Sequence, residues 1–60
     1  MELTAENLEE WKASYNQIFK TATKLSMTID QMLSDAQILE MHEGLTPKEA
    51  VEEELQYWVD

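Results

Sequence analysis

Apolar residues recur with helical spacing through the first part of the chain. They stand at alternating intervals of three and four residues, at Leu8, Trp11, Tyr15, Ile18, Ala22 and Leu25. This spacing is typical of one face of a helix and of the seam of a coiled coil. Thr4 is a candidate N-cap, and Glu6 follows in the first turn, where the helix dipole favours a carboxylate. The pattern therefore predicts a helix over about residues 4–25.

The same alternation continues without a change of phase, at Ile29, Met32, Ala36 and Leu39. Two architectures fit it. In the first, the chain turns near 26–28, a second helix spans about 28–42, and the fold is a small three-helix bundle. In the second, one helix spans about 4–42 and dimerises through the seam. Thr28 and Gln31 form a capping box that favours the turn, although Gly, Asn and Pro are absent there. We favour the bundle, and the long-helix dimer remains the alternative.

The clearest helix boundary lies just after residue 42. Gly44 and Pro47 are the only glycine and proline, and a glycine after one helix with a proline at the start of the next is the expected order. Thr46 and Glu49 then form a capping box. A third helix is predicted over about 47–59, with an acidic face opposite an apolar stripe. That stripe consists of Val51, Leu55, Trp58 and Val59.

The length of 60 residues suits one helical domain, residues 1–60, but such a chain buries only about 60% of its unfolded surface. Cysteine is absent, which excludes disulfides and leaves association with another chain as a reinforcement. No apolar run approaches the roughly 18 residues of a membrane-spanning helix. The N-terminal segment contains Glu2 and Glu6 and does not resemble a signal peptide. We expect a cytoplasmic protein, or one in the host cytoplasm if it is encoded by a phage.

The net charge of -9 narrows the class of partner. The chain has 13 acidic residues, four lysines and no arginine, so direct binding to nucleic acid or to an anionic membrane is disfavoured. The acidity is concentrated in residues 28–60, which contain nine acidic residues and one lysine, whereas residues 1–27 contain four acidic residues and three lysines. Partners should therefore be basic, and the second half should bind them.

Chemistry-bearing motifs are scarce. His42 is the only histidine, and near the end of a helix a cationic imidazole would complement the dipole. A zinc site needs further imidazole or thiolate ligands, and glycine-rich phosphate loops and nucleophile motifs are absent. We therefore expect no catalytic residue, no cofactor and no metal, and we do not expect an enzyme.

Five aromatic residues are many for so small a core. We assign Trp11, Tyr15 and Trp58 to the core, because such side chains bury about 150–250 Å² each. Phe19 and Tyr57 lie just off the apolar stripes. They are predicted to be exposed anchors at an interface, where aromatic residues are enriched.

These features predict a stoichiometric inhibitor or adaptor that masks a basic, nucleic-acid-binding surface of a protein partner. In this mechanism carboxylates occupy the positions of phosphates, and binding weakens as salt rises. The predicted partner-binding residues are Asp30, Asp35, Glu40, Glu43, Glu49, Glu52, Glu53, Asp60, Phe19 and Tyr57. In size, acidity and lack of catalytic residues the chain resembles small phage-encoded inhibitors, including anti-CRISPR and DNA-mimic proteins. That resemblance lies in composition alone.

Two other functions fit the pattern. A helical assembly or scaffolding protein would form homo-oligomers, with a homodimer as the simplest case, through the seam from Leu8 to Leu39. An antitoxin-like regulatory hairpin would wrap a partner through its apolar side chains, and its binding would survive high salt. Ile38 and Met41, which lie off the seam, either pack under Leu45 and the third helix or form an apolar patch for such a partner.

Overall fold

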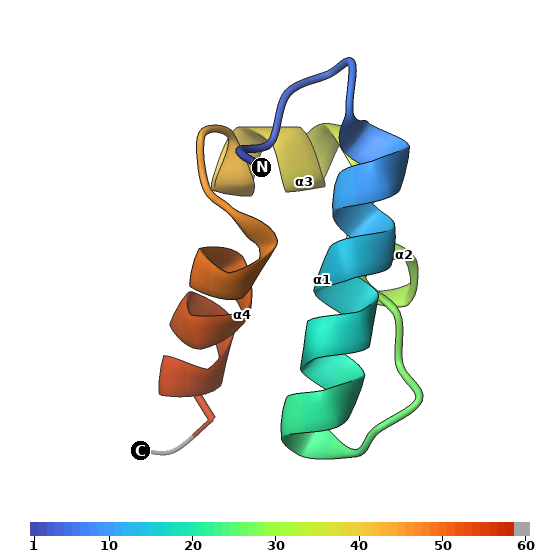
Figure 1. Ribbon diagram of the computed structural model, residues 1–60, viewed down its shortest axis with the longest axis vertical. Helices are drawn as coiled ribbons and strands as arrows, with labels where there is room; N and C mark the ends of the chain where they lie inside the picture. Colours follow the sequence, from blue (N-terminus) through green and yellow to red (C-terminus); the bar gives the residue numbers. More distant parts are fainter. Residues whose placement is uncertain (59–60) are drawn as a thin grey trace.

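The computed structural model describes residues 1–58, and within them the chain forms helices and no strands (Figure 1). The helices are α1 (Leu8–Thr23), α2 (Ile29–Met32), α3 (Asp35–His42) and α4 (Pro47–Gln56). The predicted all-α class is confirmed, and the three predicted helices correspond to these elements, with the second divided into α2 and α3. The alternative of a single helix over 4–42 is wrong, because the chain leaves the helical path at the end of α1.

The N-terminal segment is tied to the loop between α3 and α4 before α1 begins. Leu3 is fully buried. Its N–H donates to the carbonyl of Leu45 at 2.9 Å, and its own carbonyl accepts from the N–H of Gly44 at 3.2 Å. The hydroxyl of Thr4 accepts from the N–H of Asn7 at 3.3 Å, as a cap would, and the Asn7 side chain accepts from the N–H of Thr4 at 2.8 Å. Regular helix therefore begins later than the predicted residue.

The end of α1 turns the chain back along its own side. Lys24 has a left-handed backbone (φ 63°), and its N–H donates to the carbonyl of Lys20 at 2.7 Å. The N–H of Ile29 then donates to the side-chain oxygen of Asn16 at 2.8 Å. This bond satisfies a free amide at the start of α2 and fixes α2 against α1. The helix ends before residue 25, and the turn is made without glycine.

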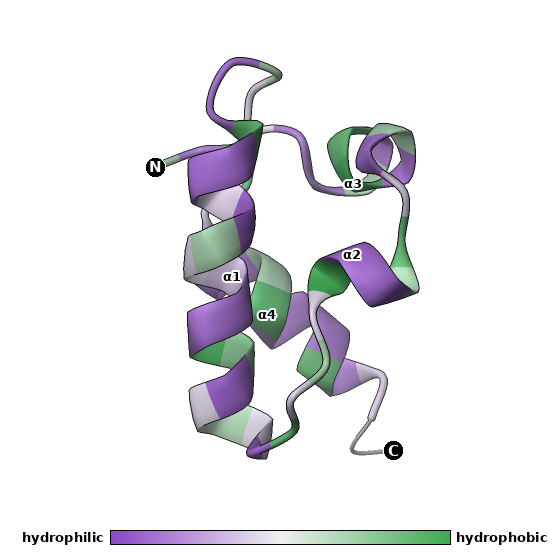
Figure 2. Ribbon diagram, turned by 90° about the vertical axis from the view of Figure 1, so that its right-hand side faces the viewer, coloured by the Kyte–Doolittle hydropathy of each residue, from purple (hydrophilic) through white to green (hydrophobic). Residues whose placement is uncertain are grey.

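The predicted helix over 28–42 is divided at Leu33 and Ser34. Leu33 is extended (φ -138°, ψ 150°), and Ser34 is the N-cap of α3. The Ser34 hydroxyl accepts from the N–H of Gln37 at 3.3 Å, while the Gln37 side chain accepts from the N–H of Ser34 at 2.9 Å. Serine competes in this way with continuation of a helix, and its capping box starts a new one in another direction (Figure 2).

The start of α4 is as predicted. The Thr46 hydroxyl accepts from the N–H of Glu49 at 3.2 Å, and a Glu49 carboxylate oxygen accepts from the N–H of Thr46 at 3.0 Å. Gly44, in the preceding loop, has a φ of 85°, which favours glycine. The helix ends at Gln56, earlier than predicted. Residues 59–60, including the end of the predicted apolar stripe, lie outside the described residues.

The core is centred on α1, which packs mainly against α4. Trp11, Tyr15 and Phe19 are buried, and their rings stack in series, with centroid separations of 5.5 and 5.9 Å. The buried stripe departs from the predicted seam, since Ala22 and Leu25 are exposed. An α-helix drifts relative to a strict heptad repeat, and without a coiled partner the residues four apart face inward. The rest of the core is Leu3, Ile29, Ile38, Ala50 and Val51.

Candidate partner-binding surface

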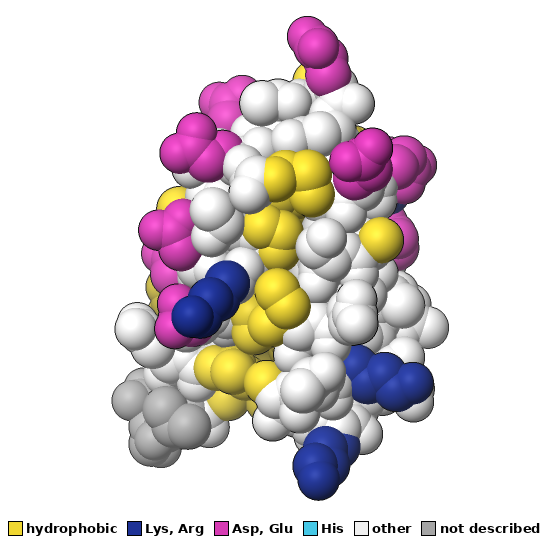
Figure 3. Space-filling model, viewed as in Figure 1, with side chains coloured by type: hydrophobic (Ala, Val, Ile, Leu, Met, Phe, Trp, Pro, Cys, Tyr) yellow, Lys and Arg dark blue, Asp and Glu magenta, His cyan; other side chains and the backbone are white. Residues whose placement is uncertain are grey.

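Carboxylates gather along the edge formed by α3 and α4 (Figure 3). The side chains of the predicted set there are exposed, namely Glu40, Glu43, Glu49, Glu52 and Glu53. Within residues 1–58 none of these carboxylates has an ion pair, because the salt bridges all belong to one lysine of α1. Asp60, the remaining predicted carboxylate of this half, lies outside the described residues. The edge is thus a predominantly negative surface, with Lys48 of α4 as an exposed cation.

Asp30 and Asp35 have a different role from the other carboxylates. Both bind the ammonium of Lys12, at 2.9 and 3.0 Å, and Glu9 lies 3.3 Å from it. The Lys12 side chain is only 8% exposed, while those of Asp30 and Asp35 are 52% and 59% exposed. The hydrogen bonds that the Lys12 ammonium donates to Asp30 and then to Asp35 raise the pKa of Lys12, against the opposing effect of burial. Their charge is therefore partly neutralised within the fold, which weakens the expectation that they face a partner.

Sequence spacing did not identify Lys12 as the centre of this cluster. Glu9 and Lys12 are neighbours on the helix surface, three residues apart, but the other two acids come from α2 and α3. Nothing local indicates that the start of α2 and the start of α3 meet the same point on α1. The sequence contains only a weak indication that Lys12 is buried, which is its position next to Trp11, beside the buried stripe.

Glu49 is also partly engaged by the fold. Its carboxylate accepts hydrogen bonds from the N–H and the hydroxyl of Thr46, each at 3.0 Å. These two bonds, the backbone one first, lower the pKa of Glu49. A change at this position would disturb the start of α4, so Glu52 and Glu53 are the better probes of partner binding.

The two predicted aromatic anchors are placed differently. Phe19 is fully buried, so the expectation that it is exposed is wrong. Trp58, predicted to be core, is 47% exposed and forms a T-shaped contact with Phe19, with ring centroids 5.6 Å apart and ring planes at 83°. Phe19 faces inward because the buried residues of α1 are spaced four apart, at Trp11, Tyr15 and Phe19. Tyr57 is 80% exposed, and its role at an interface stays a prediction.

His42 does not have the environment expected of a helix-terminal cation. It lies in the last turn of α3, but it is 5% exposed and stacks on Trp11 with ring centroids 5.8 Å apart. Burial lowers its pKa, against the opposing charges of Glu53 and Glu54. Its Nδ1 is buried and has no hydrogen-bond partner in the described structure. A neutral imidazole thus forms part of the core, with one polar atom unsatisfied.

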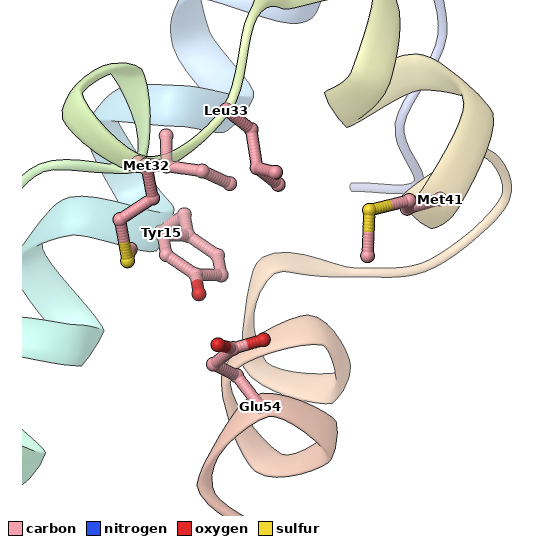
Figure 4. Close-up of a pocket in the computed structure, with 6 residues that line it drawn as sticks. Tyr15, Met32, Leu33, Met41 and Glu54 are labelled. Carbon is pink, nitrogen blue, oxygen red and sulfur yellow. The ribbon is translucent and has the colours of Figure 1, made fainter. Parts of the chain in front are cut away.

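Two cavities that share lining residues lie between the helices, and His42 borders the second. The first, of about 230 Å³, is lined by Tyr15, Ile29, Met32, Leu33, Met41 and Glu54 (Figure 4). The second, of about 190 Å³, is lined by Met41, His42, Glu53, Glu54 and Tyr57. They share Met41 and Glu54, and Met41 is 57% exposed. We call the two together the Met41 groove. Of the two placements that the sequence allows for Ile38 and Met41, Ile38 takes the buried one and Met41 the exposed one.

Among residues 1–58, no three His, Asp or Glu side chains are grouped so that they could hold a metal ion. In the same part of the chain, no helix is both long enough and apolar enough to cross a membrane. The remaining features on which a role can be argued are the carboxylates of α3 and α4 and the Met41 groove. Comparison with models of known families, with curated proteins and with solved structures finds no match to this chain.

Proposed function

We propose that the protein is a stoichiometric inhibitor or adaptor, whose acidic surface on α3 and α4 masks a basic, nucleic-acid-binding surface of a protein partner. The proposal places the protein in the cytoplasm with that partner. Small phage-encoded inhibitors of host systems perform this type of role, and the chain resembles those proteins in composition.

The observation that carries the proposal is the contrast between two groups of carboxylates. Asp30 and Asp35 share a buried lysine, whereas Glu40, Glu52 and Glu53 are exposed and have no ion pair within residues 1–58. Like charges on one helix surface repel and destabilise it, and a small fold has little stability in reserve. A basic partner would remove that repulsion on binding.

Carboxylates fixed on packed helices can compete with phosphates for the same cations. Binding would then exclude nucleic acid from the partner without any chemical step. It would be steered by charge and would weaken with salt, as contacts between Lys or Arg and phosphate do. The few lysines of this chain make the opposite arrangement, with this protein on nucleic acid, unfavourable.

The proposal is tested by affinity capture from a lysate of the source organism at about 0.1 M and about 0.5 M salt, the lower value being where the Debye length is about 10 Å. We expect a basic nucleic-acid-binding protein to be retained at low salt and released at high salt. Mass spectrometry of the eluates names it.

A pair of charge-reversed variants controls for net charge. Glu52→Lys with Glu53→Lys removes the acidic surface of α4, whereas Glu6→Lys with Glu10→Lys makes the same change in charge on exposed residues at and before the start of α1. We expect only the first variant to lose the partner. Equal retention by both variants, or capture that survives the higher salt, would overturn the proposal and favour binding through apolar side chains.

A further inference from the structure

The Met41 groove differs from the acidic surface around it because it has apolar walls and a localised charge. Tyr15 and Ile29 form its buried side, and Met32 and Leu33 line it from α2 and the residue after it. Each of its two cavities, of about 230 and about 190 Å³, is by itself smaller than the roughly 300 Å³ at which small-molecule sites begin. The dimensions suit individual side chains of a partner.

The charge in the groove is the carboxylate of Glu54. Figure 4 shows the Tyr15 hydroxyl pointing toward this carboxylate, with Met41 across the cavity. Glu54 is only partly exposed, and its carboxylate has no ion pair in the described part of the chain. Burial, followed by the charge of Glu54, raises the pKa of Tyr15 to about 12, so the phenol stays protonated and can donate a hydrogen bond. Walls of this kind accept a methylene chain that ends in a cation.

His42 borders the second cavity of the groove. His42 is 5% exposed, and its buried Nδ1 has no hydrogen-bond partner within residues 1–58. Buried polar atoms without partners are rare in folded proteins and call for an explanation. Glu53 and Glu54 line the same cavity, so the wall that contains this imidazole carries two carboxylates.

We propose that the Met41 groove receives a lysine or arginine side chain of the basic partner, with its methylene stem on Met32, Leu33 and Met41 and its charged end at the carboxylate of Glu54. The inference rests on the proposed function and adds a specific anchor to it. Long basic side chains bury their stems against apolar surface while their charged ends reach polar groups. A second copy of this chain is disfavoured as the occupant, because its net charge of -9 would meet the same acidic walls.

The test uses blocked tripeptides and the amide spectrum of the ¹⁵N-labelled protein. The probe is leucine–lysine–leucine, and the control peptide has norleucine in place of lysine, which keeps the stem and removes the charge. We expect the lysine peptide to shift the amides of Met32, Leu33, Met41 and Glu54 in a saturable manner. The norleucine peptide should bind about tenfold more weakly, as the loss of one hydrogen-bonded charge pair implies.

Matched variants distinguish binding in the groove from general attraction by the protein's negative charge. Glu54→Gln should weaken the lysine peptide by about tenfold. Glu10→Gln removes the same charge from an exposed position of α1, outside the acidic surface, and should change binding by less than about twofold. The spectrum of each variant also reports whether it is folded.

Three results would overturn the inference. Shifts spread evenly over α3 and α4 and unaffected by Glu54→Gln would mean that only the acidic surface binds, and the proposed function would stand without this anchor. Equal affinity for the norleucine peptide would make the groove purely apolar. Shifts of the same amides on raising the protein concentration alone, with a doubled mass in solution, would make the occupant a second copy. Failure of the proposed function is scored separately, by the lysate capture of the charge-reversed variants.

Discussion

Lys12 and His42 are both buried, and their surroundings shift their pKa values in opposite directions. Lys12 keeps its proton because Asp30, Asp35 and Glu9 surround its ammonium. His42 stacks against aromatic rings, and burial lowers its pKa in spite of the nearby carboxylates of α4. A buried cation is tolerated where carboxylates bind it, and a buried base without a direct partner becomes neutral.

The His42 environment predicts a loss of stability in mild acid. In the unfolded chain a histidine has its ordinary pKa of about 6.5, while in the folded chain the pKa is lower. As the pH falls through about 6.5, His42 therefore becomes protonated in the unfolded state but not in the folded state. The free energy of unfolding then decreases by at most about 1.4 kcal/mol per pH unit. The effect should end once the pH falls below the folded pKa.

The measurement is the urea concentration at the unfolding midpoint of the wild type and of His42→Phe, taken between about pH 7.5 and about pH 5.5. This interval lies above the pH of about 4 at which Asp and Glu side chains titrate. Phenylalanine keeps a ring against Trp11 but cannot titrate. We expect the wild-type midpoint to fall across this interval and that of the variant to stay level. Parallel slopes for the two proteins would show that His42 is not the group responsible.

At the scale of the elements, capping boxes determine where helices begin. Ser34 and Thr46 each exchange hydrogen bonds with a residue three positions later, and each follows backbone that is not helical. The consequence is that α3 and α4 start in new directions. The chain therefore folds back on α1 and does not extend the seam into one long helix.

Replacing the cap of α4 tests this directly. Thr46→Ala removes both hydrogen bonds to Glu49 that involve the hydroxyl and should lower the free energy of unfolding by about 1 kcal/mol. Thr21→Ala is the matched control, because the exposed Thr21 hydroxyl donates to the carbonyl of Gln17 within α1. Alanine has the higher helix propensity there, so a change near zero or slightly stabilising is expected. Equal losses in urea unfolding would contradict this account of the cap.

Local signals made part of the fold predictable. The helix boundary before α4 depends on a few neighbouring residues, namely Gly44, Thr46, Pro47 and Glu49. The predicted start of that helix is therefore correct. The Thr28 cap was also visible, and its N–H indeed donates to the Gln31 side chain, at 3.1 Å. The division at Ser34 has the same local origin, yet a heptad pattern that runs through it concealed the break.

Tertiary contacts account for what sequence could not provide. The inward position of Phe19 depends on how α1 crosses its neighbours, and the burial of Leu3 depends on a distant loop, at Leu45. Asp30 and Asp35 could be recognised as acidic but not as partners of Lys12. Of the candidate site, the exposure of the carboxylates of α3 and α4 was predictable from composition and helical spacing. The Met41 groove was not, because its lining residues come from all four helices and depend on how these pack together.

At the scale of the whole molecule, the ion-paired carboxylates gather around one lysine, and the acidic side chains of the α3–α4 edge lie apart from that cluster. The cation of Lys12 lies among acids from α1, α2 and α3, while the edge of α3 and α4 has no ion pair in residues 1–58. An apolar groove with its own carboxylate adjoins that edge. The molecule thus combines a broad negative surface, suited to steering a basic partner, with a small site suited to fixing its register.

The most direct test of the central claim is competition, with the captured partner bound to a fluorescent nucleic acid and increasing amounts of this protein added. The account predicts displacement that is complete near a one-to-one ratio, that requires more protein as salt rises, and that is lost in the Glu52→Lys, Glu53→Lys variant but kept in Glu6→Lys, Glu10→Lys. A stable complex of all three components, or displacement by the α4 variant as effective as by the wild type, would contradict the claim that this acidic surface takes the place of nucleic acid.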